Sequence, residues 1–354
     1  MTDDLQTKLA GEFRHQAKAC REIGSPLYAQ LCELVAADLE AGGVCWSVLK
    51  SHAHVRFGLA IPLRFLGGVH RLVQLGRAPE LAGEYPSVGG TPTERLWPAF
   101  CDVVGRERDD VVAALDRDVQ TNEVVRCAAL SEGLRAIQAR TGLPLSLREV
   151  GTSAGLNLQM DRFAYVDDDR IGGDPASRLR IVDRWRGSTR PSLADLDIVD
   201  RAGCDPNPID PSTAEGRARL LGFLWPDQLD RRERTLAAID LVTAHPSRIE
   251  RANAETWLGA ELGARHSGAV TVVFHSIVWQ YIDKDERTRI TALMEATGKG
   301  AMGQAPLAWL RFEPRESDRS CAALTLRLWD GSTDDAEPIE LAISGFHGEW
   351  VELR

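Results

Sequence analysis

The segment PLSLREVGTSAG, residues 144–155, most constrains the fold of this chain. Its apolar run ends in Glu149 and predicts a β-strand, and the two glycines that follow predict a tight turn. Gly151 lets the backbone bend without a Cβ, and Gly155 lets a following helix begin close against the strand. A strand that enters a helix through such a turn predicts an α/β fold that binds its ligand at the carboxyl ends of the strands.

The sequence on the two sides of this turn has different periodicity. Residues 1–140 carry apolar side chains at helical spacing, which predicts an all-helical domain. From residue 141 to residue 354, short apolar runs alternate with helical segments, which predicts a parallel sheet covered by helices. The expected strands are 144–150, 197–205, 247–253, 269–276, 306–313, 324–330 and 339–346. The last two should pair antiparallel, and about 163–187 should form an inserted β-hairpin.

Composition excludes several classes of function. The formal net charge of −10 argues against broad affinity for nucleic acid, which Lys and Arg confer by neutralising phosphates. The first residues do not resemble a signal peptide, and no apolar run is long enough to span a membrane. Seven scattered cysteines without a CxxC pair predict reduced thiols in a cytoplasmic protein. His52 and His54 are two residues apart and face different sides of a helix, so we expect no metal site.

Polar residues end three further predicted strands. Asp205 lies in the turn-rich segment GCDPNPIDP, where it either holds a ligand hydroxyl or simply closes a turn. Asn253 either faces the ligand or caps the helix that begins at Ala254. His275 ends a strongly apolar strand at the ligand-binding edge, where it either functions directly or is a buried structural histidine.

The motif EVGTSAG resembles the first motif of class I S-adenosylmethionine-dependent methyltransferases, an acidic residue followed by GxGxG. Ser153 departs from that pattern, because it stands where the family has glycine. The resemblance implies a Rossmann-like methyltransferase sheet at 141–354, with the 1–140 domain as a helical cap. In the family, the first loop wraps the methionine part of the cofactor, the second strand ends in an acid that holds the ribose, and the third carries a polar residue beside adenine.

Carried onto this chain, the resemblance implies a set of cofactor-binding residues: Glu149, Gly151, Ser153, Gly155, Asn157, Asp205 and Asn253. Asp183 is the alternative to Asp205 as the ribose acid. Asn122 and Arg126 belong to the segment QTNEVVR, whose helix leads directly into the first strand, so we expect both to project over the cofactor. Alternatively, Thr121 or Asn122 caps that helix. The fourth strand faces the methyl acceptor in the family. We therefore expect His275 or Tyr281 to be the catalytic base toward a small-molecule acceptor.

A second likeness covers nearly the whole chain. The segments SPLYAQL, QTNEVVR, EVGTSAGLNL, GCDPNPIDP and VFHSIVWQY resemble a bacterial family known as domain of unknown function 2332.

Two other functional interpretations remain open. GTSAG also matches the GxSxG nucleophile elbow of serine hydrolases, with Ser153 as nucleophile and His275 or His347 as base, although that fold places strands before its elbow. Because Ser153 replaces a glycine, a non-catalytic nucleotide sensor is the other alternative.

Overall fold

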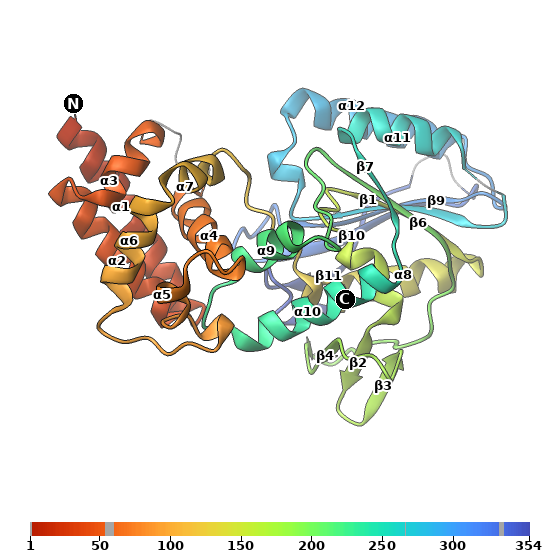
Figure 1. Ribbon diagram of the computed structural model, residues 1–354. Helices are drawn as coiled ribbons and strands as arrows, with labels where there is room; N and C mark the ends of the chain where they lie inside the picture. Colours follow the sequence, from red (N-terminus) through yellow and green to blue (C-terminus); the bar gives the residue numbers. More distant parts are fainter. Residues whose placement is uncertain (1, 54–59, 266, 333–335) are drawn as a thin grey trace. The chain divides into compact units, whose positions relative to one another are not determined.

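The computed structural model describes residues 2–53, 60–265, 267–332 and 336–354 (Figure 1). The chain divides into two compact units. The first, here the helical unit, comprises Met1–Thr121 and Asp210–Leu236. The second, here the sheet unit, comprises Asn122–Ile209 and Ala237–Arg354. The chain therefore leaves the sheet unit and returns to it, whereas the sequence predicted one boundary at residue 140.

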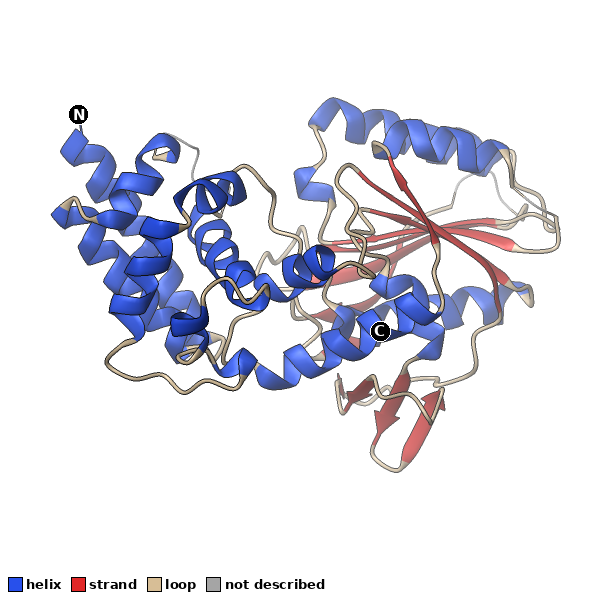
Figure 2. Ribbon diagram, viewed as in Figure 1, coloured by secondary structure: helices blue, strands red, loops and turns tan. Residues whose placement is uncertain are grey.

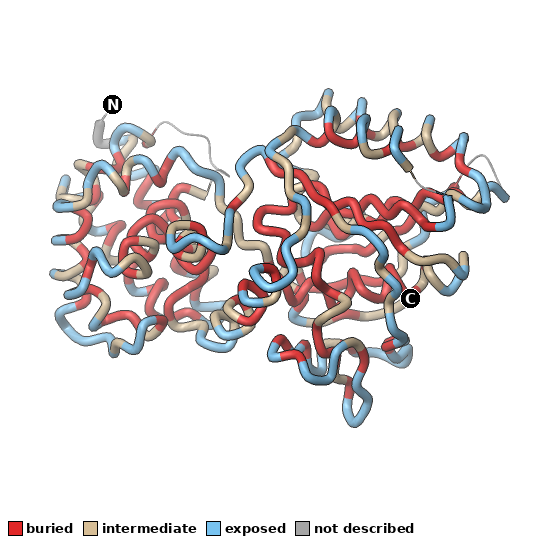
Figure 3. Tube along the Cα trace, turned by 45° about the vertical axis from the view of Figure 1, so that its right-hand side comes forward, coloured by how far each residue is buried: buried red, intermediate tan, exposed pale blue. Residues whose placement is uncertain are grey.

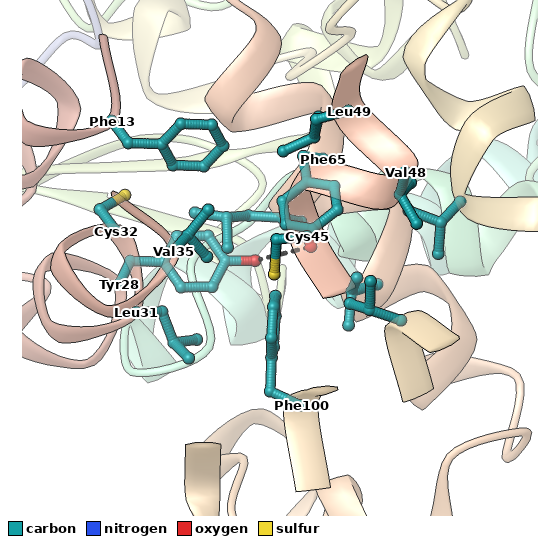
Figure 4. Packing of buried hydrophobic residues seen from close by; sticks show 14 of the residues in the cluster. Phe13, Tyr28, Leu31, Cys32, Val35, Cys45, Val48, Leu49, Phe65 and Phe100 are labelled. Atoms are coloured by element: carbon teal, nitrogen blue, oxygen red, sulfur yellow. Dashed lines mark hydrogen bonds between the residues drawn. The ribbon is translucent and has the colours of Figure 1, made fainter. Parts of the chain in front are cut away.

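The helical unit is built around aromatic and aliphatic side chains (Figure 4). Phe65 packs edge-on against Phe13 and Phe100, and the hydroxyl of Tyr28 donates to the carbonyl of Leu66 at 3.3 Å. Its helices are α1 (Thr2–Glu22), α2 (Pro26–Ala41), α3 (Val44–Leu49), α4 (Ile61–Gln74), α5 (Pro79–Ala82), α6 (Leu96–Arg106), α7 (Arg108–Leu115), α9 (Ala214–Gly222) and the first part of α10 (Leu229–Ala244), with the 3₁₀ turns η1 (Lys50–His52) and η2 (Pro86–Val88).

Three contacts explain why residues 210–236 belong to the helical unit. The guanidinium of Arg71 forms two hydrogen bonds with the carboxylate of Glu215, at 2.7 and 3.0 Å. His70 donates a hydrogen bond from its Nδ1 to the carbonyl of Leu224 at 2.9 Å. The side chain of Asp227 accepts the backbone N–H of Leu27 at 2.9 Å, which ties this segment to the start of α2.

The sheet unit contains a nine-stranded sheet in the order β5-β12-β11-β10-β9-β8-β1-β6-β7 (Figure 2). Its five parallel neighbours are β7 (Arg248–Arg251), β6 (Ile198–Asp205), β1 (Leu145–Val150), β8 (Val270–Ser276) and β9 (Leu307–Pro314). Three antiparallel pairings then add β10 (Ala322–Trp329), β11 (Ile339–Ser344) and β12 (Val351–Leu353), and β5 (Trp185–Arg186) joins β12 in parallel.

Helices cover both faces of this sheet, and the central strands are buried (Figure 3). Helix α8 (Cys127–Thr141) packs on one face, where Gly133 lies against Leu310. Helices α11 (Ala254–Gly263) and α12 (Lys284–Lys299) cover the other face, where Trp309 belongs to the same apolar cluster as Trp257 and Met294. Short 3₁₀ segments, η3 (Val124–Arg126), η4 (Leu156–Arg162) and η5 (Trp279–Tyr281), lie beside the strand ends.

The predicted α/β architecture, a mostly parallel sheet with helices on both faces, is confirmed. The antiparallel pairing of the last two predicted strands is also confirmed, although β12 and β5 extend the sheet beyond them. The insertion is more than a hairpin: β2 (Ala164–Asp167) and β3 (Arg170–Gly173) form one, and β4 (Arg180–Val182) then pairs with β2 in parallel. Within the described ranges, no helix is long and apolar enough to cross a lipid bilayer.

The strand order sets the position of the candidate site. Strand β1 lies between β6 and β8. The chain passes from β1 to β6 on one side and from β8 to β9 on the other, so these two connections run in opposite directions across the sheet. In open α/β sheets, such a reversal leaves a crevice outside the carboxyl ends of the strands, where ligands bind. The turn after β1 lies at that edge.

Candidate functional site

The turn after β1 adopts a left-handed backbone at three positions, with φ of +70° at Gly151, +53° at Ser153 and +73° at Gly155. Only Ser153 carries a side chain there, and an L-residue in this region is strained. The backbone N–H groups of Gly151 and Thr152 both donate to the carbonyl of Cys204, at 2.9 and 3.0 Å. The turn is therefore fastened to the end of β6.

Two side chains hold the rest of the turn. The N–H of Ser153 donates to Asp205 Oδ2 at 2.9 Å. The N–H groups of Ala154 and Leu156 donate to Asn122 Oδ1, at 3.4 and 3.3 Å, and the N–H of Gly155 donates to Thr152 within the turn. Every backbone N–H from residue 151 to residue 156 is thus used inside the sheet unit, so this turn does not present the row of free N–H groups that cradles a phosphate.

Glu149 lies beneath the turn and is 2% exposed. Thr152 donates its hydroxyl to Glu149 Oε2 at 2.6 Å, and the Asn157 amide approaches Glu149 Oε1 at 3.5 Å. Burial raises the pKa of Glu149 from 4.5 to about 8, and the nearby carboxylate of Asp205 raises this pKa further. Glu149 is therefore mainly protonated at neutral pH, and any cation placed near it would favour its ionisation.

The two glycines of the turn face neighbouring side chains. A Cβ at Gly151 would overlap the side chain of Val278, which follows β8, and one at Gly155 would lie 2.7 Å from Ile249 Cδ1 of β7. The sequence predicted a backbone bend at Gly151 and close packing of the following helix at Gly155. In the structure, packing of the turn against its neighbours and the positive φ values already require them.

At the end of β8, His275 is 1% exposed and its Nδ1 lies 2.6 Å from Glu313 Oε1, which β9 supplies. The same oxygen accepts the backbone N–H groups of Val278 and Trp279, at 3.1 and 3.2 Å. Because Oε1 already accepts two hydrogen bonds, we assign the proton between the two side chains to His275 Nδ1. In the neutral ring, His275 Nε2 then carries a lone pair, the arrangement of a histidine base oriented by a carboxylate.

Aromatic rings and a cation surround this pair. The Trp279 ring stacks on His275 with centroids 5.0 Å apart, and Trp309 lies edge-on to Trp279 at 5.6 Å. The guanidinium of Arg311 lies over both indoles, 5.1 Å from Trp279 and 4.9 Å from Trp309. Ile277 has a φ of +52°, and strain in a β-branched residue marks this loop as held in an unusual conformation.

Arg126 links the segment before α8 to this edge. It donates to the carbonyl of Phe346 at 2.9 Å and to the carbonyl of Ser276 at 3.2 Å. Its positive charge also favours ionisation of Glu149, although burial outweighs it.

Tyr281 behaves differently from the other predicted residues, because it is 69% exposed and its backbone N–H donates to Val278. The ring that stacks on His275 is Trp279, two residues earlier.

The structure resolves several alternatives that the sequence left open about local roles. Asp205 ends β6 and also closes a turn, since its Oδ1 accepts the N–H of Asn207 at 2.8 Å. Asn253 caps α11 by accepting the N–H of Thr256 at 2.9 Å, so the capping interpretation is confirmed. Asn122 fastens the β1 turn, and Glu123 instead caps η3. Asp183 lies beside the small inserted sheet, where it accepts the N–H of Asp168.

The groups needed for a serine hydrolase are not joined. Across the part of the chain that the structure describes, neither Ser153 Oγ nor His275 Nε2 has a hydrogen-bond partner, although both atoms are buried. The bond between nucleophile and base that defines such a site is therefore not formed. Of the two neighbouring histidines, His52 pairs with Asp116, and His54 lies outside the described residues.

Glu313 is the main residue that sequence reasoning missed. The sequence does contain a signal for Glu313, because the apolar run PLAWLRFE ends in this residue. This run is the next predicted strand after the one that ends in His275. Parallel neighbours bring their carboxyl ends to one edge, and β8 and β9 pair in register with His275 beside Arg311. The sequence alone does not show that His275 and Glu313 lie on neighbouring strands, because this requires the strand order.

These features define a two-unit α/β protein with polar residues at the carboxyl ends of β6, β1, β8 and β9, where Glu149 and His275 lie on opposite faces of the sheet. The chain belongs to the family described as an uncharacterized protein conserved in bacteria (DUF2332), whose model matches residues 10–353. Comparison with curated proteins and with solved structures found no match.

Proposed function

We propose that this protein binds S-adenosylmethionine at the β1 turn and transfers its methyl group to a small-molecule acceptor. The observation that carries the proposal is the turn itself. It lies where the strand order reverses, its N–H groups are consumed internally, and Glu149 and Asp205 flank it. The order β7-β6-β1-β8-β9 supports a Rossmann-like methyltransferase sheet as the finer description of the fold.

The donor set fits this cofactor better than a dinucleotide or ATP. Pyrophosphate-binding turns offer free N–H groups and favour anions. Here the N–H groups are satisfied and carboxyl groups lie alongside, which suits a ligand without phosphate that carries a sulfonium and an ammonium. Asp205 accepts the backbone N–H groups of Ser153 and Asn207, and in this proposal its carboxylate, which has about four acceptor positions, also accepts the ribose hydroxyls.

Methyl transfer from a sulfonium supplies an already activated methyl group, so the protein has to align the acceptor and exclude water. In this proposal His275 removes the acceptor proton through Nε2. Asn253 retains its amide nitrogen for adenine, because only its carbonyl oxygen caps α11. Tyr281, exposed beyond Trp279, contributes to the acceptor side. The free thiols of the described chain suit a cytoplasmic setting.

Calorimetry in two buffers of different ionisation enthalpy tests the cofactor. A cation bound near Glu149 lowers the pKa of that carboxyl group from about 8, so S-adenosylmethionine should release a fraction of a proton on binding at neutral pH. Glu149→Gln should still bind but release none. ATP and NAD, which are anionic, should cause no release. Failure of both S-adenosylmethionine and S-adenosylhomocysteine to bind would remove the assignment.

The same preparation separates the two rival functions. Labelling of Ser153 by a fluorophosphonate, lost in Ser153→Ala, would establish the hydrolase, although within the described residues Ser153 Oγ is buried and has no hydrogen bond to a base. Binding of the cofactor without methyl transfer to any acceptor would instead support the non-catalytic sensor.

A further inference from the structure

The pair His275–Glu313 lies in a group of buried polar atoms whose hydrogen bonds are incomplete. Among the described residues, His275 Nε2, Glu313 Oε2, Arg311 Nε and Trp309 Nε1 are all buried without a hydrogen-bond partner. Nearly all buried polar atoms in folded proteins are paired, so several unpaired atoms in one place indicate a missing ligand group or water. The atoms share one face of adjacent strands, since His275 pairs in register with Arg311.

The hydrogen-bond pattern determines what could bind to the imidazole. Glu313 Oε1 accepts two backbone N–H groups and the Nδ1 proton, so in the neutral imidazole Nε2 is left as an acceptor. A ligand group that reaches Nε2 must therefore donate a hydrogen. Hydroxyl, amine and thiol groups meet this condition, whereas a carboxylate, an ether or a ketone does not.

The charge and shape of the surrounding residues restrict which hydrogen-donating group could bind at His275 Nε2. Arg311 pairs in register with His275 and places its guanidinium over Trp279, so a second cation such as an ammonium is disfavoured there. The same guanidinium would stabilise an oxygen that becomes negative as its proton leaves. Trp279 is part-exposed and stacks on the buried imidazole, so a flat aromatic ring borders the reactive nitrogen.

We propose that the methyl acceptor is a neutral hydroxyl compound with a flat apolar body, that its O–H donates to His275 Nε2, and that Glu313 is the positioning residue for this base. The inference rests on the proposed methyl transfer. The acceptor O–H bond breaks and its proton passes to Nε2, an O–CH₃ bond forms as the S–CH₃ bond breaks, and the sulfonium becomes a neutral thioether. The ether product has no hydrogen to donate to Nε2, which favours its release.

The first test needs no cofactor. In the full-length protein labelled with ¹⁵N-histidine, the neutral ring of His275 should carry its proton at Nδ1 and none at Nε2. Glu313→Gln should keep this tautomer, because its carbonyl oxygen can still accept the same three hydrogen bonds. Glu313→Ala should convert the ring toward the Nε2–H form. Finding wild-type His275 protonated at Nε2 would refute the positioning role.

The second test uses phenol, aniline and benzoate as matched probes with methyl-tritiated S-adenosylmethionine. Label should pass to phenol, at a rate lowered about 100-fold or more in His275→Ala. Glu313→Gln, which loses the charge facing the imidazolium, should be slower by about 10-fold, and Glu313→Ala slower still. The exposed His245→Ala serves as the control variant.

The outcomes separate the two proposals. If calorimetry detects binding of S-adenosylmethionine but label passes to aniline, to benzoate or to none of the probes, the hydroxyl assignment is refuted and the cofactor assignment stands. If the cofactor does not bind at all, the proposed function fails first and the acceptor assignment fails with it. Equal transfer rates in wild type and Glu313→Ala would also refute the role of Glu313.

Discussion

Substitution of Glu149 by glutamine should make the stability of this protein less dependent on pH. Glu149 is buried and receives the Thr152 hydroxyl at 2.6 Å. Its pKa is raised to about 8, mainly by burial, whereas in an unfolded chain the pKa stays near 4.5. Glutamine has almost the same shape, accepts the same hydroxyl and does not titrate, so the variant isolates the effect of the proton.

The sign and size follow from proton linkage. Between the two pKa values the folded state of the protein holds more protons than the unfolded state, so stability falls as pH rises from about 4.5 through about 8. Each pH unit in the window costs about 1.4 kcal/mol, and the full shift corresponds to roughly 5 kcal/mol. Between about pH 5.5 and pH 7.5, wild type should lose about 2.5 kcal/mol relative to Glu149→Gln.

Urea unfolding of both proteins at several pH values measures this difference, because contributions from other titrating groups cancel in the comparison. Glu337→Gln, which changes an exposed carboxyl group, controls for the loss of one acid. Parallel stability curves for wild type and Glu149→Gln would show that Glu149 is ionised in the folded protein at neutral pH. The expected proton release on cofactor binding would then have no source either.

Three further predictions concern stability. The pKa of His70 is lowered from 6.5 to about 4, chiefly by burial. The free energy of unfolding should therefore fall by about 3 kcal/mol as pH falls from 6.5 to about 4, and His70→Gln should show a shallower dependence of stability on pH in this range. Gly298→Ala should cost about 1–3 kcal/mol in urea unfolding, since its Cβ would overlap the buried Trp329 ring; an unchanged midpoint would show that the ring can move. Asn253→Ala should cost about 1 kcal/mol through loss of the cap on Thr256, and Asn253→Ser should recover most of it.

The sequence predicted the sheet better than the division into units. Alternation of short apolar runs with helical segments identifies β1, β6, β7, β8 and β9, because buried parallel strands have near-continuous apolar sequences. The segment 210–236 has the same helical periodicity as an ordinary crossover helix between parallel strands. Its membership of the helical unit depends on long-range contacts, such as Arg71 with Glu215 and Leu27 with Asp227, which periodicity does not report.

The candidate site was predictable where function follows from position along one strand. A polar residue at the end of an apolar strand lies at the ligand edge in any parallel sheet, which is why Asp205 and His275 were identified. Asn122 was identified only by its nearness in sequence to the first strand, and its hydrogen bonds to the turn depend on a φ of +37° that the sequence does not reveal. Glu313 required knowledge that β9 pairs with β8.

The two titratable side chains of the candidate site, Glu149 and His275, are expected to exchange protons in opposite directions. Glu149 lies under the β1 turn with its proton held by burial, and it would lose that proton when a cation binds nearby. His275 lies at the end of the adjacent strand with Nδ1 committed to Glu313 and Nε2 available to receive a proton. Val278 connects the two, because it packs against Gly151 while its N–H donates to Glu313. A change at the turn is therefore expected to reach the histidine through one residue, so Gly151→Ala should disturb His275 as well as cofactor binding.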